Sequence, residues 1–129
     1  MPYSLRFVKP LRIVDRGRYN NPGCIGGDQV LEQLLPALEV SYGQVHLQQE
    51  DAGWLASFER NGSRLAVDVH TSDDRAGEFE VHLVSRTRKL LFGSKVQDTE
   101  ELDGLRDLVA NELRAWHVSD LAVERVEVH

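Results

Sequence analysis

The most regular pattern in the chain is an alternation of hydrophobic and polar residues on both sides of Asn61-Gly62. This dipeptide tolerates the positive φ angles that a two-residue β-hairpin turn requires. Pairing the residues around the turn places three apolar pairs opposite each other: Phe58 with Leu65, Ala56 with Val67, and Trp54 with Val69. Because a shift of one residue would turn all of these side chains to the other face, the pattern predicts both a hairpin and its register.

The same alternation continues into the neighbouring segments. Across a turn at residues 50–53, it places Val45 and Leu47 opposite Phe58 and Ala56. Across a loop at residues 72–77, it places Phe79, Val81 and Leu83 opposite Val69, Val67 and Leu65. These pairings predict a four-stranded antiparallel meander with one apolar face, which needs a second layer to cover it.

The segment from Asp28 to about Val40 has the spacing of an amphipathic helix that can cover this face. Its apolar residues stand at positions 30, 31, 34, 35 and 38, and Asp28 is placed to cap its N-terminus. Pro36 is expected to kink or shorten the last turn, and Gly43 is expected to end the helix.

A second helix is predicted from about Thr99 to His117. Its apolar stripe runs through positions 102, 105, 109, 113 and 116. Asp98 and Glu101 have the spacing of a capping box. We expect both helices to lie across the apolar face of the sheet.

The two ends of the chain are predicted to be strands. Apolar residues alternate at Tyr3, Leu5 and Phe7, and the alternation resumes after Pro10. Because proline has no N–H for a sheet ladder, we expect an edge strand or a strand broken in two. The tail "LAVERVEV" can pair with this first strand. Residues 1–129 thus form a single α+β domain with the order β-α-β-β-β-β-α-β. Its antiparallel sheet comprises the central four-stranded meander plus the N- and C-terminal strands, covered on one face by two helices.

Composition limits the kind of protein this is. The chain has 129 residues, 41% hydrophobic and 28% charged, which is the balance of an ordinary globular domain. It contains no apolar run long enough to span a membrane and no secretory signal pattern near its N-terminus. The single cysteine fits a reducing cytoplasm, although a secreted chain without its signal would look the same. We expect a cytoplasmic protein.

The net charge of −6 bears on the choice of partner. An acidic chain repels nucleic acid and anionic membranes, so neither is expected as a partner. A basic protein is the partner that such a charge favours. Exposed sheet edges also allow a homodimer.

The glycine-rich segment "RGRYNNPGCIGGDQ" precedes the first helix and could hold an anion, present a thiolate or turn the chain. A phosphate loop needs Lys-Ser/Thr after its glycine, but Asp28-Gln29 stands there, and a tight turn is the favoured interpretation. Cys24 is a nucleophile only if a histidine lies nearby, and a lone cysteine is more often a small buried hydrophobe. No cofactor is expected.

The outward face of the meander carries the candidate site. Its residues are His46 and Gln48, then Leu55, Ser57 and Glu59, then Arg64, Ala66, Asp68 and His70, then Glu78, Glu80 and His82. The predicted register places Asp68 beside Glu80, with two histidines diagonally close. Such a face can be plain solvated sheet, a binding surface or a metal or catalytic site. No metal site is expected, because histidines spread over a flat sheet cannot close a four-ligand shell.

A basic run follows the fourth strand of the meander. Arg86, Arg88, Lys89 and Lys95 surround an apolar Leu90-Leu91-Phe92. Basic residues around an apolar group form an ordinary interface, although nearby acidic residues offset the charge.

No Ser-His-Asp order, HExxH, paired CxxC, EF-hand or kinase signature is present, so no catalytic residue is assigned. The sequence favours a non-catalytic, acidic protein-binding module of the adaptor, chaperone or toxin-neutralising type. We assign partner binding to Asp68, His70, Glu78, Glu80, His82, Arg86, Arg88 and Lys89. The alternative is a small enzyme or a ligand or metal binder that uses Cys24 or the group Asp68, His70 and His82.

Overall fold

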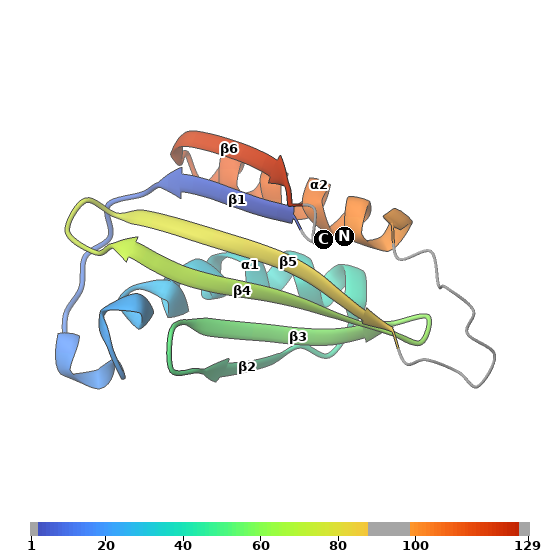
Figure 1. The fold of residues 1–129 in the computed structure, drawn as a ribbon, viewed down its shortest axis with the longest axis horizontal. Coiled ribbons are helices and arrows are strands. Elements are labelled where there is room, and N and C mark those ends of the chain that lie inside the picture. The colour runs from blue at the N-terminus through green and yellow to red at the C-terminus, as the bar shows by residue number, and fades with distance from the viewer. Residues whose placement is uncertain (1–2, 88–98, 127–129) are drawn as a thin grey trace.

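The elements follow the predicted order and confirm the α+β class (Figure 1). The structure is a computed structural model that describes residues 3–87 and 99–126. Its strands are β1 (Tyr3–Val8), β2 (His46–Gln49), β3 (Trp54–Arg60), β4 (Ser63–Asp73), β5 (Glu78–Thr87) and β6 (Ser119–Arg125). Its helices are α1 (Gly27–Tyr42) and α2 (Thr99–Ala115), with two short 3-10 turns before α1, Arg16–Arg18 and Pro22–Cys24.

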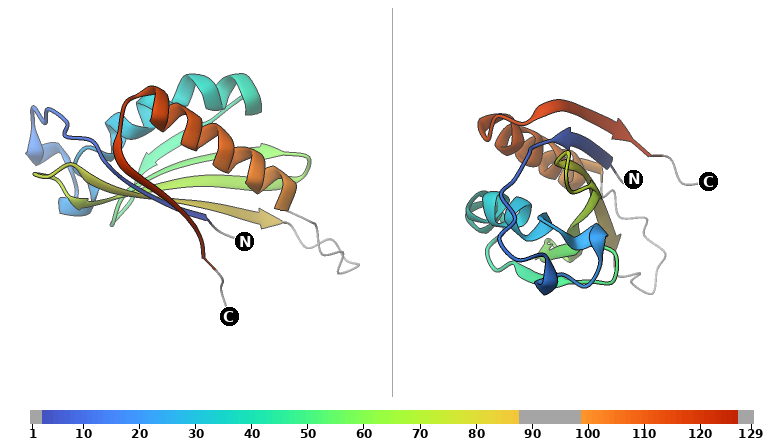
Figure 2. Two further views of the ribbon diagram at one scale, coloured as in Figure 1. Left: turned by 90° about the horizontal axis from the view of Figure 1, so that it is seen from above. Right: turned by 90° about the vertical axis from the view of Figure 1, so that its left-hand side faces the viewer.

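All six strands belong to one antiparallel sheet in the order β2-β3-β4-β5-β1-β6. Figure 2 shows both helices on the same side of this sheet. Helix α1 packs on β3 and β4, and α2 packs on β5 and β1. Neither α1 nor α2 covers the other side of the sheet, called the open face below, although the 3-10 turn Pro22–Cys24 contacts β4 near His70.

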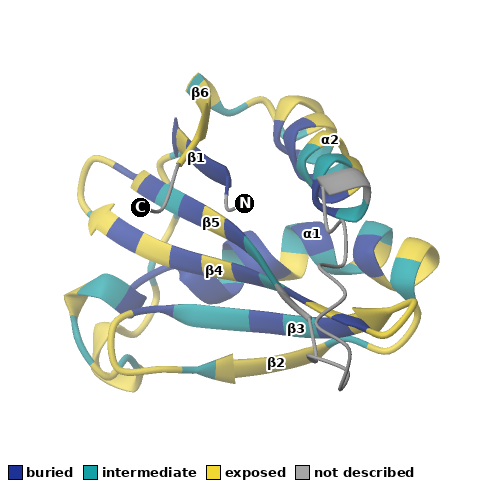
Figure 3. Ribbon diagram, turned by 45° about the vertical axis from the view of Figure 1, so that its right-hand side comes forward, coloured by how far each residue is buried: buried dark blue, intermediate teal, exposed yellow. Residues whose placement is uncertain are grey.

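The core lies between the sheet and the two helices. Burial alternates along β4, as the colours of Figure 3 show, and the buried positions are those of the core face. The side chains of Leu31, Leu34 and Leu38 on α1 and of Leu105, Val109 and Leu113 on α2 are fully buried against it. The apolar face of the sheet is therefore confirmed, and so are the two predicted helical stripes, except at Leu35, which is half-buried and lies outside the core cluster.

The first strand is not the edge strand that the sequence predicted. Strand β1 lies between β5 and β6, and it ends at Val8, so Pro10 stands outside the ladder. The Lys9 N–H donates to the Gly77 carbonyl at 2.7 Å, just before the proline. Residues 11–14, where the apolar pattern resumes, form no strand. The pairing of the C-terminal strand with the first strand is confirmed.

The central hairpin has the predicted register. Phe58 lies opposite Leu65 and Ala56 opposite Val67, and Asn61 and Gly62 have positive φ angles of 52° and 79°. Strand β2 has the predicted register, with Leu47 opposite Ala56, although it begins at His46, so the predicted pair of Val45 and Phe58 lies outside the ladder. At this edge of the sheet, however, Leu47 remains 40% exposed.

The predicted register between β4 and β5 is wrong by two residues. Val69 lies opposite Val81 and Val67 opposite Leu83, and β4 extends into the predicted loop as far as Asp73. Between Thr71 and Asp73 the pairing is irregular, and β4 has one more residue than β5 there. A shift of two residues leaves every side chain on its original face, so alternation alone could not detect it.

The start of α1 also differs from the prediction. The N-cap is Gly26, with φ 86° and no side-chain cap, whereas Asp28 lies inside the helix and is buried. Its carboxylate accepts hydrogen bonds from the Tyr19 hydroxyl at 2.8 Å and from the Arg18 guanidinium. Asp28 does not cap the helix because its carboxylate is turned toward these two loop side chains.

The other helix boundaries are close to those predicted. Pro36 lies within α1, which continues to Tyr42 and ends at Gly43 with φ 82°. Helix α2 ends at Ala115, two residues earlier than expected. Asp98, half of the predicted capping box, lies outside the described residues.

Two glycines provide a test of this arrangement. Gly77 has φ 74°, and a Cβ there would lie 2.6 Å from the backbone of Lys9, so Gly77→Ala should lower the free energy of unfolding by at least about 1 kcal/mol.

Gly104 lies in α2 with open space around its Cα. Gly104→Ala should raise the free energy of unfolding by about 0.5–1 kcal/mol. Urea denaturation measures both, and a fully stable Gly77→Ala variant would contradict the contact between the β4–β5 turn and the end of β1.

Candidate functional site

The glycine-rich loop before α1 is anchored to the ends of β3 and β4. The Trp54 indole N–H donates to the Cys24 carbonyl at 2.8 Å, and the Thr71 hydroxyl donates to the Ile25 carbonyl at 2.7 Å. The side chain of Asn21 accepts from the Gly23 N–H at 2.9 Å. These contacts support the interpretation of this segment as a structural turn.

Cys24 is fully buried within this loop. Its sulfur lies 3.2 Å from the Glu50 carbonyl oxygen and 3.6 Å from that of Gly53. Carbonyl oxygens accept a hydrogen bond from a thiol but have none to donate to a thiolate. The predicted burial of Cys24 is confirmed, and its surroundings do not favour a nucleophilic role.

The open face gathers the acidic and histidine residues that the sequence singled out. Asp68 and His70 lie on β4, and Glu78, Glu80 and His82 lie on β5, all on the side away from the helices. The observed register places Asp68 directly opposite His82, and His70 directly opposite Glu80. The predicted neighbourhood of Asp68 and Glu80 is therefore wrong, and each carboxylate instead faces an imidazole across the strands.

Glu80 is held in its charged form by two hydrogen-bond donors. Nε2 of His82 lies 2.7 Å from Oε1 of Glu80, and the buried Ser4 hydroxyl donates to the same oxygen at 3.1 Å. The hydrogen bond from His82 is the main reason why the pKa of Glu80 is lowered, and the one from Ser4 adds to it.

The ring of His70 is oriented by the turn between β2 and β3. Its Nδ1 lies 2.7 Å from the Ala52 carbonyl oxygen. Because a carbonyl only accepts, Nδ1 carries the proton of this hydrogen bond. In the neutral ring, Nε2 is then left as an acceptor.

Two adjoining depressions on the open face share Glu50 and Asp68, and together they are called the sheet hollow below. The first has a volume of about 480 Å³ and is lined by Gln48, Glu50, Leu55, Ser57, Arg64, Ala66, Asp68 and Val84. The second has a volume of about 250 Å³ and is lined by Glu50, Ala52, Gly53, Asp68, His70 and His82. The hollow combines apolar and charged side chains.

The environment of Asp68 in this hollow disfavours its charged form. Although the residue as a whole is exposed, loss of hydration around the carboxyl group is the main reason why its pKa is raised. The charge of Glu50 raises the pKa further, while His82 and His70 lower it. None of the ion pairs within the described part of the chain involves Asp68 or Glu50.

Some predicted site residues lie apart from the hollow. Glu78 lines another depression with Arg6 and Asp120. Strand β5 places the backbone of Arg86 opposite Arg64, but the position of the Arg86 side chain is not described. Arg88 and Lys89 lie outside the described residues.

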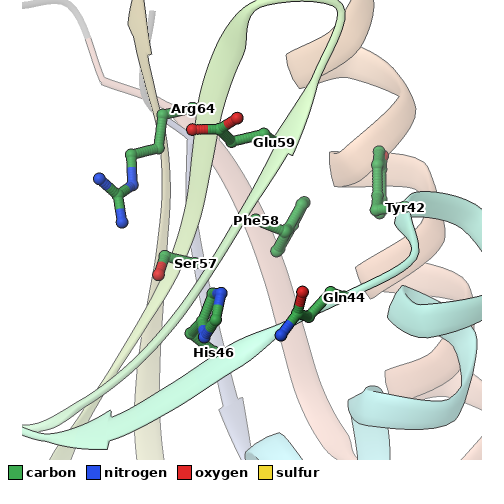
Figure 4. A pocket seen from close by; sticks show the side chains of 7 residues that line it. All are labelled: Tyr42, Gln44, His46, Ser57, Phe58, Glu59 and Arg64. Atoms are coloured by element: carbon green, nitrogen blue, oxygen red, sulfur yellow. The ribbon is translucent and has the colours of Figure 1, made fainter.

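His46 lines a separate pocket of about 240 Å³ at the β2 edge of the sheet (Figure 4). Ser57 and Arg64 line both this pocket and the hollow. The ring of Tyr42 stacks on Phe58 at its inner side, with ring centroids 4.6 Å apart. The three histidines expected on one face therefore do not form one cluster.

Four residues that line the hollow do not belong to the predicted outward face: Glu50, Ala52, Gly53 and Val84. The first three belong to the predicted turn at residues 50–53, and alternation does not indicate where a turn side chain points. Val84 was not considered, although it continues the outward series of Glu80 and His82 on β5. The alternation along β5 therefore indicates that Val84 lies on the outward face.

Among the residues described, no three His, Cys, Asp or Glu side chains lie close enough to hold a metal ion. None of the described helices is both long and apolar enough to cross a membrane. No protein-family model matches the chain, and no curated protein matches its sequence. The candidate site is therefore interpreted from its own geometry.

The two pKa shifts predict opposite effects of neutral substitutions. A raised pKa means that ionised Asp68 destabilises the folded state once the pH exceeds the folded pKa, so Asp68→Asn should be as stable as the parent or more stable at pH 7. A lowered pKa means that ionised Glu80 stabilises the fold, and this contribution is lost as the pH falls through the folded pKa. Glu80→Gln should therefore be destabilised at pH 7.

Urea denaturation at pH 7 and at a pH below the ordinary glutamate pKa measures both differences from the parent, and both should shrink at the lower pH. A loss of stability at pH 7 that is as large for Asp68→Asn as for Glu80→Gln would contradict the environment assigned to Asp68.

Proposed function

We propose that this protein is a cytoplasmic, non-catalytic module that binds a basic protein partner through its open face, with the sheet hollow at the centre of the contact. The observation that carries the proposal is the hollow itself. Its half-buried apolar side chains adjoin Asp68 and Glu50, which make no ion pair within the described part of the chain.

The composition of the hollow supports a protein partner. Protein interfaces place apolar groups at the centre and polar groups at the rim. Leu55, Ala66 and Val84 are half-buried, and exposed Gln48 and Arg64 stand beside them. The net charge of −6 favours a partner of opposite charge and speeds its association. Adaptors, chaperones and toxin-neutralising proteins share this size and charge, which is an analogy only.

A second candidate is a small-ligand binder or enzyme at the histidine end of the hollow. The observation that favours it is the orientation of His70, whose Nδ1 is occupied by the Ala52 carbonyl. The neutral ring then leaves Nε2 as an acceptor in the depression that it shares with Asp68 and His82. The next experiment distinguishes the two candidates, because only the first requires a protein partner.

Charge reversal on the open face tests the proposed function. The parent protein is used to capture partners from an extract of its own cells at low and moderate salt, and the partners are identified by mass spectrometry. The double variant Glu50→Lys with Asp68→Lys should capture at least about tenfold less of the partner than the parent does. The new lysines would repel the basic groups of the partner. Glu80 is left intact because its contacts with Ser4 and His82 belong to the fold.

The matched control is Glu32→Lys with Glu39→Lys, which changes the net charge equally at exposed positions of α1. It should retain the partner. Equal loss in both double variants would show only a general charge effect and would contradict the assigned surface. Capture of no protein at all would contradict the proposed function and favour the second candidate. Light scattering of the purified protein determines whether the partner is a second copy.

A further inference from the structure

Three apolar side chains on neighbouring strands form a continuous patch in the sheet hollow. Leu55 of β3, Ala66 of β4 and Val84 of β5, called the apolar patch below, are half-buried. Ala66 lies directly opposite Val84, and Leu55 lies diagonally next to Ala66. The patch lies on the side of the sheet away from the core. Apolar residues there are unusual, because the outer side of a half-solvated sheet is ordinarily polar.

Glu50 and Asp68, called the acidic pair below, stand beside this patch. Glu50 follows β2 and Asp68 lies on β4, and both line both depressions of the hollow. Both carry the same charge when ionised, and the charge of Glu50 raises the pKa of Asp68. A cation between them would relieve this repulsion. An arginine guanidinium has five N–H donors and can contact both carboxylates.

The patch and the pair are close enough for one short segment to contact both. Asp68 lies directly opposite Leu55, and opposed side chains in a sheet have Cβ atoms about 5 Å apart. Side chains two residues apart in an extended segment are separated by about 7 Å. Those three or four residues apart on a helix are separated by about 5–6 Å.

We propose that the partner presents an apolar side chain to the apolar patch and an arginine or lysine to the acidic pair from a single segment. The two residues stand two positions apart if the segment is extended, or three to four apart if it is helical. This recognition rule rests on the proposed function and specifies the chemistry of its partner. A purely basic tail satisfies only half of the surface, and an acidic segment is repelled by it.

Selection of random peptides on the immobilised full-length protein tests the rule. Enriched peptides should combine an aliphatic or aromatic residue with arginine or lysine at one of these spacings. Their affinity should fall at least about tenfold for the Glu50→Lys, Asp68→Lys double variant and severalfold for Leu55→Ser with Val84→Ser. Val40→Ser, which removes an apolar side chain that is 88% exposed on α1, should leave the affinity unchanged. Urea denaturation of each variant establishes that it is folded.

Two results would overturn the rule. The first is that the enriched peptides are basic without an apolar neighbour and bind the Leu55→Ser, Val84→Ser variant as tightly as the parent. The second is that no peptide is enriched at all. If the cell partner still depends on the acidic pair in either case, the proposed function stands and only the recognition rule fails. If peptides obey the rule but no cell protein is captured, the surface chemistry is supported and the proposed function fails.

Discussion

The whole structure depends on burying one face of a six-stranded antiparallel sheet under two helices. Helices α1 and α2 share the four strands β3, β4, β5 and β1 between them, and their apolar stripes complete the core. Because side chains alternate along a strand, the neighbours of each residue that faces the core lie on the other side of the sheet. The open face is thus fixed by the same register that forms the core, although neither α1 nor α2 packs on it.

That division separates residues that stabilise the fold from residues available for binding. Ser4 and Glu80 belong to the first kind, because their hydrogen bonds tie β1 to β5. Asp68 belongs to the second, because its carboxyl is partly desolvated and has a like charge nearby, which is unfavourable in the free protein. Its charge does not stabilise the fold, and the partner cation that we propose would offset the cost of that charge. The proposed contact would include the adjacent apolar patch on the same strands.

Local pattern was enough to predict the element order, both helical stripes and the β3–β4 hairpin, because each follows from spacing along the chain. The same pattern gave wrong predictions where the structure depends on contacts between residues far apart in the sequence. The β4–β5 register depends on an irregularity at Thr71, which alternation does not encode. Asp28 accepts from Arg18 and Tyr19, which a capping pattern cannot anticipate. The face was predicted, but the hollow was not, because Glu50 enters it from a turn.

We propose that Asp68 in the sheet hollow pairs with a cation of the partner. The pH titration of its side-chain carboxyl carbon by NMR tests this pairing, in the free protein and in the complex with a captured basic partner or a selected peptide. In the free protein, the pKa of Asp68 should lie above the ordinary aspartate value. Binding should lower this pKa, because a cation stabilises the carboxylate. A pKa that is the same in the free protein and in the complex would show that no partner cation pairs with Asp68.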